Sequence, residues 1–180
     1  MPIHSRPRSG GRLHLPNQET TSVQEAHNGN AIAFLRICVG LLFIILGQYK
    51  VIGSDFTRGG GFQFWINRFL QDGAYPFMVP VLKGFVLRHA TGIAYLVAYG
   101  ELAIGLSLLI GLWSRIASIF GFIYMMGLLF SSNYPGAPAP FWQYFGASLD
   151  HSVLALCFLT FLFGEPELRL SVKHLRYDPR

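Results

Sequence analysis

The stretch TGIAYLVAYGELAIGLSLLIGLW, residues 91–113, decides the fold class of this chain. Its length and apolar character suffice for a helix that crosses a lipid bilayer, which needs about 20 such residues. Its only formal charge is Glu101, close to the centre of the stretch. An acidic residue at the middle of a span costs roughly 2.5–3.5 kcal/mol on insertion scales. Glu101 is therefore expected to have a partner or a function.

The composition of the whole chain also indicates an integral membrane protein. Of the 180 residues, 52% are hydrophobic and only 13% are charged, whereas soluble domains carry roughly 25% charged residues. The net charge is +5, but the cations cluster at the ends of apolar runs. That placement suits lipid headgroups and membrane orientation rather than nucleic acid.

Four apolar runs predict an all-α integral membrane protein, a bundle of four transmembrane helices. The first three cover residues 31–49, 91–113 and 116–130, and the fourth ends at Gly164. Only Ser114 and Arg115 connect the second and third runs, so these two helices must be antiparallel. Residues 1–29 are predicted to be a disordered polar tail before an uncleaved first span. Residues 30–165 form the predicted membrane domain, and residues 166–180 a basic cytoplasmic tail.

The connection between the first two spans contains two amphipathic segments. In GFQFWINRFLQ, Phe62, Trp65, Ile66 and Phe69 recur at helical spacing. A second segment begins at Pro80 and places Val81, Leu82 and Phe85 against Lys83 and Arg88. Helices of this kind lie in the membrane interface. With four spans, eight Lys and Arg share the side of the termini and five lie on the other side, which predicts cytoplasmic termini.

The polar and small residues of the spans fall on shared helix faces. One face of the first span is formed by residues spaced alternately four and three apart, namely Arg36, Gly40, Phe43, Gly47 and Lys50. The same spacing recurs in the second span, at Ala94, Ala98, Glu101, Gly105 and Leu108. It recurs again in the fourth span, at Asp150, Leu154, Cys157 and Phe161. If the span centres coincide, Arg36 and Glu101 lie at similar depth and form an ion pair. The pair is either structural or part of a ligand or proton site.

Asp150 and His151 form a second polar pair, whose side chains point in different directions because the residues are consecutive. Asp150 either begins the fourth helix, where the helix dipole favours a carboxylate, or meets Lys50. In the second case His151 titrates near neutral pH. Cys38 lies on a different face from Cys157, so both are expected to remain inert thiols.

With the spans placed, the chain resembles the DoxX superfamily. FLRICVGLLFIILGQYKVI (residues 34–52) looks like the opening span of that superfamily, and GELAIGLSLLIGLWSRIASIFG (residues 100–121) is similar to its second and third spans. The intervening FTRGGGFQFWINRFL (residues 56–70) looks more like the DoxD branch, the small subunit of thiosulfate:quinone oxidoreductase.

The resemblance implies a four-helix bundle in a bacterial or archaeal membrane that passes electrons from a reduced sulfur compound such as thiosulfate to quinone, with a second protein subunit. The sequence shows no haem ligand pair, flavin motif or metal cluster. The catalytic candidates are Glu101, His151 and Asp150, and the candidate cofactor-binding cations are Arg36 and Lys50. Two function classes remain open: a quinone-linked redox subunit, or a non-catalytic membrane scaffold that docks a partner protein.

Overall fold

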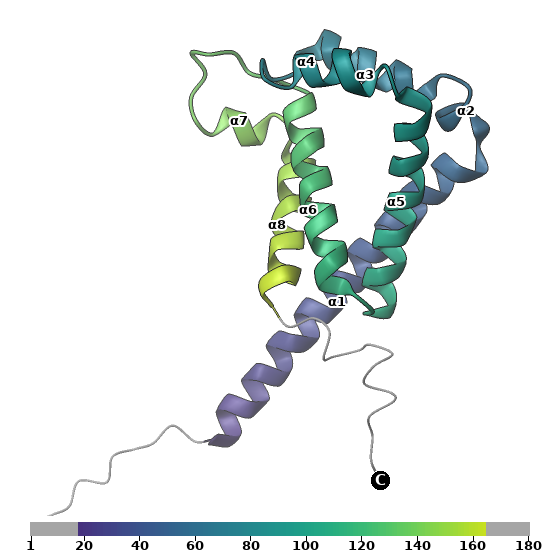
Figure 1. Cartoon of the computed structure of the whole chain (residues 1–180). Helices are drawn as coiled ribbons and strands as arrows, with labels where there is room; N and C mark the ends of the chain where they lie inside the picture. Colours follow the sequence, from purple (N-terminus) through teal and green to yellow (C-terminus); the bar gives the residue numbers. More distant parts are fainter. Residues whose placement is uncertain (1–17, 165–180) are drawn as a thin grey trace, which may run out of the picture.

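All regular structure in the described part of the chain is helical (Figure 1). The computed structural model describes residues 18–164, with side chains described for residues 27–164. Four long helices are α1 (Gln18–Ile52), α5 (Ala90–Ile110), α6 (Ser114–Ser131) and α8 (Leu149–Phe163). The shorter segments are α2 (Ser54–Thr57), α3 (Gly61–Asp72), α4 (Val79–Val81), the π-helix η1 (Leu82–Val86) and α7 (Gln143–Gly146).

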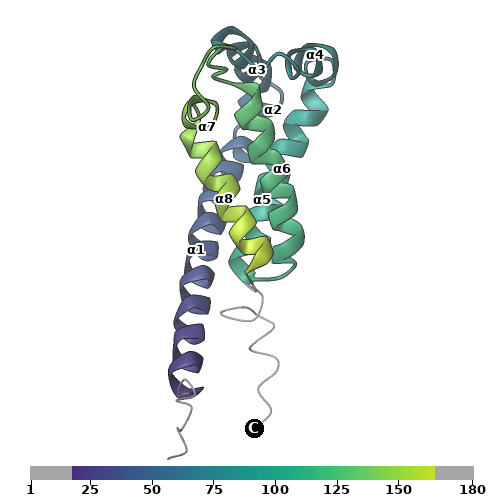
Figure 2. The ribbon, with the colours of Figure 1, turned by 90° about the vertical axis from the view of Figure 1, so that its left-hand side faces the viewer.

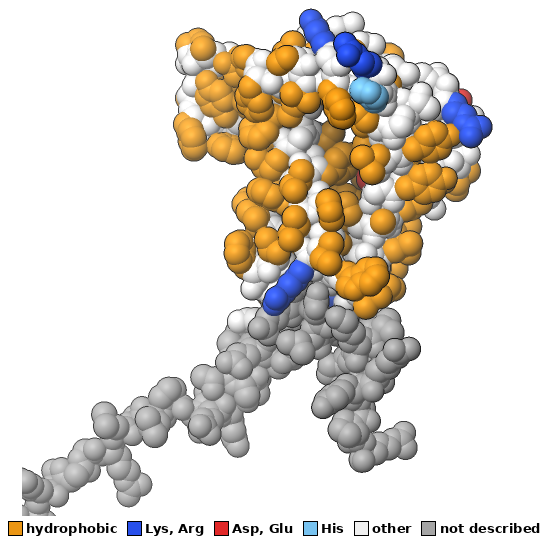
Figure 3. Space-filling model, in the orientation of Figure 1, with side chains coloured by type: hydrophobic (Ala, Val, Ile, Leu, Met, Phe, Trp, Pro, Cys, Tyr) orange, Lys and Arg blue, Asp and Glu red, His pale blue; other side chains and the backbone are white. Residues whose placement is uncertain are grey.

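Three of these helices are long and apolar enough to cross a membrane, namely residues 27–52 of α1 and the whole of α5 and α6. Many of their large apolar side chains are exposed. Figure 3 shows these side chains as a band between cations at the two ends of the molecule. The chain is therefore an integral membrane protein. The helix α8 is apolar but has only 15 residues, so a fourth crossing stays a prediction.

The long helices pack as two antiparallel pairs, α1 against α5 and α6 against α8, which diverge from the α5–α6 turn (Figure 1). Close contact in each pair depends on glycine. A Cβ atom on Gly105 would lie 2.8 Å from the Gly40 carbonyl oxygen, and one on Gly121 would lie 2.3 Å from the Phe158 ring. The turn itself uses left-handed backbone at Gly111 and Trp113. Ser114 and Arg115, predicted to form this turn, instead begin α6.

Two of the three predicted buried faces are confirmed. On α1, Arg36, Gly40, Phe43 and Gly47 are buried and Lys50 is half-buried, and on α5 the buried face runs from Ala94 through Glu101 to Leu108. The prediction for α8 is confirmed at Phe161, which is buried, and is wrong at Asp150, while Leu154 and Cys157 are half-buried against the core. The buried residues of α8 are Ala155, Phe158 and Phe161, and Asp150 is exposed.

A cap of short helices covers the end of the bundle opposite the α5–α6 turn (Figures 1 and 2). Residues 62–70, predicted to be helical, lie within α3. Phe62 and Ile66 of α3 pack with Leu82 in a cluster that includes the start of α5, whereas Trp65 is 51% exposed. The predicted apolar face therefore divides between the protein core and the surface, and an interfacial position for α3 stays a prediction.

The ends of the described chain lie at the same end as the α5–α6 turn (Figure 1). Helix α1 begins at Gln18 and extends beyond the other helices (Figure 2). The prediction of a disordered tail therefore does not hold for residues 18–29, which are helical, and residues 1–17 of that tail lie outside the described residues. The predicted basic tail, residues 166–180, also lies outside them.

Candidate functional site

Glu101 is the centre of a buried polar network formed by three helices. Its carboxylate is 3% exposed, and the Lys50 ammonium of α1 donates to its Oε1 atom. The Tyr124 hydroxyl of α6 donates to the same oxygen at 2.6 Å. Bonds between an ionised group and a neutral donor are stronger than those between neutral groups. A single carboxylate oxygen on α5 thus accepts hydrogen bonds from a side chain of α1 and a side chain of α6.

Glycine contacts between α1 and α5 determine which cation reaches Glu101. A Cβ atom on Gly47 would lie 2.9 Å from the Leu102 backbone nitrogen, so these two positions are in direct contact. Lys50 lies one helical turn beyond Gly47 and is therefore level with Glu101. Arg36 lies about 21 Å away from Lys50 along α1 at 1.5 Å per residue.

The predicted ion pair between Arg36 and Glu101 is therefore wrong, and Lys50 takes the place of Arg36. The error came from assuming that the centres of the two spans lie at the same depth. Arg36 is nevertheless completely buried, as the predicted face required. It belongs to the end of the bundle near the α5–α6 turn, at a distance from the network around Glu101.

Lys50 connects the network to the cap. Its side chain is 19% exposed, and its ammonium lies 5.2 Å from the centre of the Phe56 ring of α2. A cation at this distance from an aromatic ring is attracted to the ring face. The network therefore has a buried acidic end at Glu101 and a partly accessible basic end beneath the cap.

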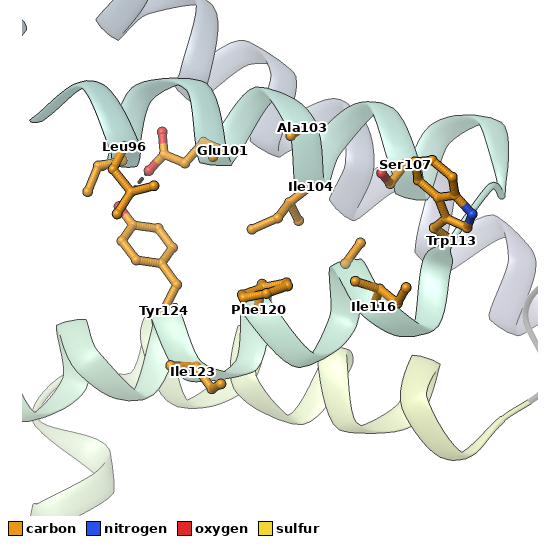
Figure 4. A pocket seen from close by; sticks show the side chains of 13 residues that line it. Leu96, Glu101, Ala103, Ile104, Ser107, Trp113, Ile116, Phe120, Ile123 and Tyr124 are labelled. Atoms are coloured by element: carbon orange, nitrogen blue, oxygen red, sulfur yellow. Dashed lines mark hydrogen bonds between the residues drawn. The ribbon is translucent and has the colours of Figure 1, made fainter. Parts of the chain in front are cut away.

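A groove of about 470 Å³ separates α5 from α6, and Glu101 and Tyr124 lie at one end of it (Figure 4). Ile104 and Phe120 project into the groove from opposite helices, and Trp113 lies at its far end (Figure 4). Apart from Glu101, Tyr124 and Ser107, the residues that line it are apolar or aromatic. Small-molecule sites in proteins have this size and this mixture of apolar walls and few polar groups.

A comparison with protein-family models gives one match, the DoxX model, over residues 31–133. The chain belongs to the DoxX family. The matched segment contains Lys50, Glu101 and Tyr124, and it covers every residue that lines the groove. No curated protein and no solved structure matches the chain.

The predicted pair of Asp150 and His151 lies after the DoxX segment, in the first turn of α8. Asp150 is 72% exposed, and its Oδ1 atom lies 3.3 Å from His151 Nδ1, so the prediction that these side chains point apart is wrong. Lys50 binds Glu101 rather than Asp150. Asp150 therefore has the position expected for a carboxylate in the first turn of a helix. Neither Asp150 nor His151 lines the groove.

Tyr124 is the residue of the network that sequence reasoning did not identify. The sequence contains a signal for it, since Glu101 and Tyr124 lie at nearly equal distances from the α5–α6 turn. Two antiparallel helices place such residues at the same level. Among the described residues, no group of three His, Cys, Asp or Glu side chains could hold a metal ion.

Proposed function

We propose that this DoxX protein is the membrane subunit of a redox system that passes electrons to quinone. The observation that carries the proposal is the position of the Lys50–Glu101–Tyr124 network, buried among membrane-spanning helices at one end of an apolar groove. Ionisable residues inside spans are rare and commonly mark proton or substrate pathways. A groove in this part of the molecule is accessible to compounds dissolved in the bilayer.

The groove suits the ring of a quinone. Its volume of about 470 Å³ lies within the range of roughly 300–1,000 Å³ typical of small-molecule sites. Ile104 and Phe120 supply apolar walls for a ring, and the side chains of Glu101 and Tyr124 lie at one end of the groove. Glu101 and Tyr124 would lie nearest to the ring oxygen, with Lys50 behind them.

Quinone reduction requires protons as well as electrons, and this chain supplies groups for protons. Glu101 can hold a proton, and Tyr124 can transfer one between Glu101 and the groove along their hydrogen bond. Lys50 neutralises the carboxylate while it is ionised. We propose that a second protein subunit delivers the electrons, and that their source is a reduced sulfur compound such as thiosulfate, as in the DoxD-like branch.

We further propose a bacterial or archaeal cell membrane with both termini in the cytoplasm. The end of α8, the α5–α6 turn and Arg115 share one end of the molecule, which the cation count assigns to the cytoplasm. In a cysteine-free variant, a membrane-impermeant thiol reagent applied from outside should label a cysteine at Pro138 and not one at Arg115. The opposite pattern would contradict this orientation.

The function is tested with protein purified from its native membrane together with whatever co-purifies. The preparation should reduce a short-tailed quinone with thiosulfate, and Glu101→Gln should abolish turnover while the protein remains folded and bound to its partner. Ile119→Val, on the exposed surface of α6 outside the groove, is the matched control and should retain turnover. A Glu101→Gln preparation with unchanged turnover would contradict the proposal and favour a non-catalytic scaffold.

A further inference from the structure

The two oxygens of the Glu101 carboxylate have different surroundings. Oε1 accepts from the Lys50 ammonium and from the Tyr124 hydroxyl. Oε2 is buried and has no hydrogen-bond partner in the part of the chain that the structure describes. In Figure 4 this second oxygen points away from Tyr124 and from the groove. A proton can therefore add to Oε2 without displacing either donor from Oε1.

We infer that Glu101 takes up its proton at Oε2 from the aqueous phase on the cap side of the membrane, by a route that passes Lys50, and not from the side of the α5–α6 turn. In this step a hydronium ion leaves its proton on Oε2 and becomes water, while the Lys50 ammonium keeps its three hydrogens. The inference rests on the proposed function, in which Glu101 carries protons, and adds the side from which they come. It does not depend on which compound occupies the groove.

An apolar core separates Glu101 from the α5–α6 turn. Phe43 of α1 and Leu108 of α5 belong to this core and are fully buried. The backbones of the two helices are in contact at this level, since a Cβ atom on Gly40 would lie 3.0 Å from the Gly105 carbonyl oxygen. A water molecule inside a protein needs room and several polar partners, and this seam offers neither. It therefore blocks protons that come from the turn side.

The groove between α5 and α6 does not connect Glu101 to water either. Most of the residues that line it are apolar or aromatic, and the two helices that form it are long and apolar enough to cross a membrane. A hydronium ion is excluded from such surroundings, because an unpaired charge is costly to transfer out of water. The groove therefore admits apolar compounds from the bilayer and not protons from an aqueous phase.

The cap side, in contrast, brings water close to Lys50. The short helix α2 follows α1 directly, and Asp55 in it and Arg58 just after it are exposed. Exposed charges on both sides of Phe56 place α2 at the membrane surface, because charged side chains are unfavourable in hydrocarbon. The Lys50 ammonium lies 5.2 Å from the centre of the Phe56 ring, and its side chain is 19% exposed. Lys50 therefore stands between this surface and Glu101.

Few other charged groups surround the network. In the described part of the chain, the titratable side chains that contact Glu101 are those of Lys50 and Tyr124. Arg36 of α1 lies beyond the apolar core, toward the α5–α6 turn. The charged residues of the other elements packed against α5 are exposed, namely Asp55, Arg58, Arg68, Asp72 and Arg115. The charge that a proton meets on the proposed route is therefore that of Lys50.

The test uses the full-length protein in lipid vesicles whose inner and outer buffers differ in pH, with the membrane potential clamped by potassium and valinomycin. Dicyclohexylcarbodiimide dissolves in the bilayer and adds to protonated carboxyl groups, so it can reach Glu101 through the groove whichever side it is added from. Mass spectrometry measures the adduct on Glu101, and Glu101→Gln identifies its signal. The fraction of molecules with the cap outward is found by labelling Pro138→Cys in a cysteine-free variant with an impermeant thiol reagent.

Lowering the pH on the cap side from about 8 to about 6 should raise the rate of adduct formation roughly tenfold or more, because the protonated fraction of a carboxyl group changes by up to tenfold per pH unit. The same change on the turn side should leave the rate unchanged. Tyr124→Phe should keep the dependence on cap-side pH, since the route to Oε2 does not include the tyrosine.

The inference is overturned if adduct formation follows the pH on the turn side, follows both sides equally, or responds to neither. Turnover separates the inference from the proposed function. Control of the adduct by cap-side pH in a complex that never reduces quinone refutes the function and leaves the route standing. Quinone reduction that consumes protons from the turn side, observed with a pH-sensitive dye trapped in the vesicles, refutes the route and leaves the function standing.

Discussion

Removing Lys50 should destabilise the protein more than removing the charge of Glu101. Lys50→Met strands a carboxylate that is 3% exposed and is left with Tyr124 as its donor. Glu101→Gln strands an ammonium that is 19% exposed and lies beneath the cap, where its flexible stem can carry it to the surface. The two partners of this ion pair are therefore not equivalent.

The expected magnitudes follow from this difference in burial. Removal of one partner from a buried pair costs roughly 3–5 kcal/mol, and Lys50→Met should reach that range. For Glu101→Gln we expect roughly 1–3 kcal/mol, the cost of imperfectly satisfied polar groups. The double variant should be more stable than the sum of the two effects by about 2 kcal/mol or more, as for residues in direct contact.

The free energy of unfolding can be measured by titrating the purified protein from mild detergent into SDS. Arg36→Met combined with Glu101→Gln is the comparison, because the structure places these two side chains at different levels of the bundle. That second cycle should be additive within about 0.5 kcal/mol. Additive effects for Lys50 and Glu101, or strong coupling between Arg36 and Glu101, would refute the assignment of Lys50 as the partner.

Three further predictions concern packing, thiols and pH. Gly105→Ala should destabilise the α1–α5 pair by roughly 1–3 kcal/mol in the same SDS titration, because its methyl group meets the opposite backbone. A Ser variant of both Cys38 and Cys157 should keep its fold and turnover, since both thiols are free; loss of turnover would revive a dithiol mechanism. Burial raises the pKa of Tyr75 in the cap, whose hydroxyl donates to the Tyr144 carbonyl at 2.7 Å. Its contribution to stability is present below pH about 10 and lost as pH rises through the raised pKa, so melting temperatures of wild type and Tyr75→Phe should converge above that pH.

The membrane class and the inward faces of α1 and α5 could be predicted from the sequence. Small and polar residues gather on helix faces that pack against other helices rather than on faces that contact lipid. The face shared by Gly40, Gly47 and Lys50 was therefore expected to point into the protein. The identity of the Glu101 partner could not be predicted in the same way. It depends on the sliding register of two helices, which the contact between Gly47 and Leu102 determines, and periodicity alone leaves this register undefined.

The groove and the buried face of α8 were even less predictable from the sequence than the partner of Glu101, because both depend on how the helices pack. The groove exists because α5 and α6 diverge from their turn, and no pattern within either helix specifies that angle. For α8, the contact of Phe158 with Gly121 determines which face is buried, and this turns Asp150 outward. Tyr124 was predictable in principle, because a short turn places it level with Glu101.

The most direct test of the network and its ligand is a solid-state NMR distance measurement in bilayers. The sample would combine protein labelled with ¹³Cζ-Tyr and a quinone labelled with ¹³C at its carbonyl carbons. We predict a contact between the ring and one tyrosine that disappears in Tyr124→Phe. It should also disappear in Gly100→Leu, which places a side chain in the groove, and persist in Gly127→Leu, which lies outside the groove. A contact that survives Tyr124→Phe, or a saturably bound ring without any tyrosine contact, would contradict a site at the Glu101–Tyr124 end of the groove.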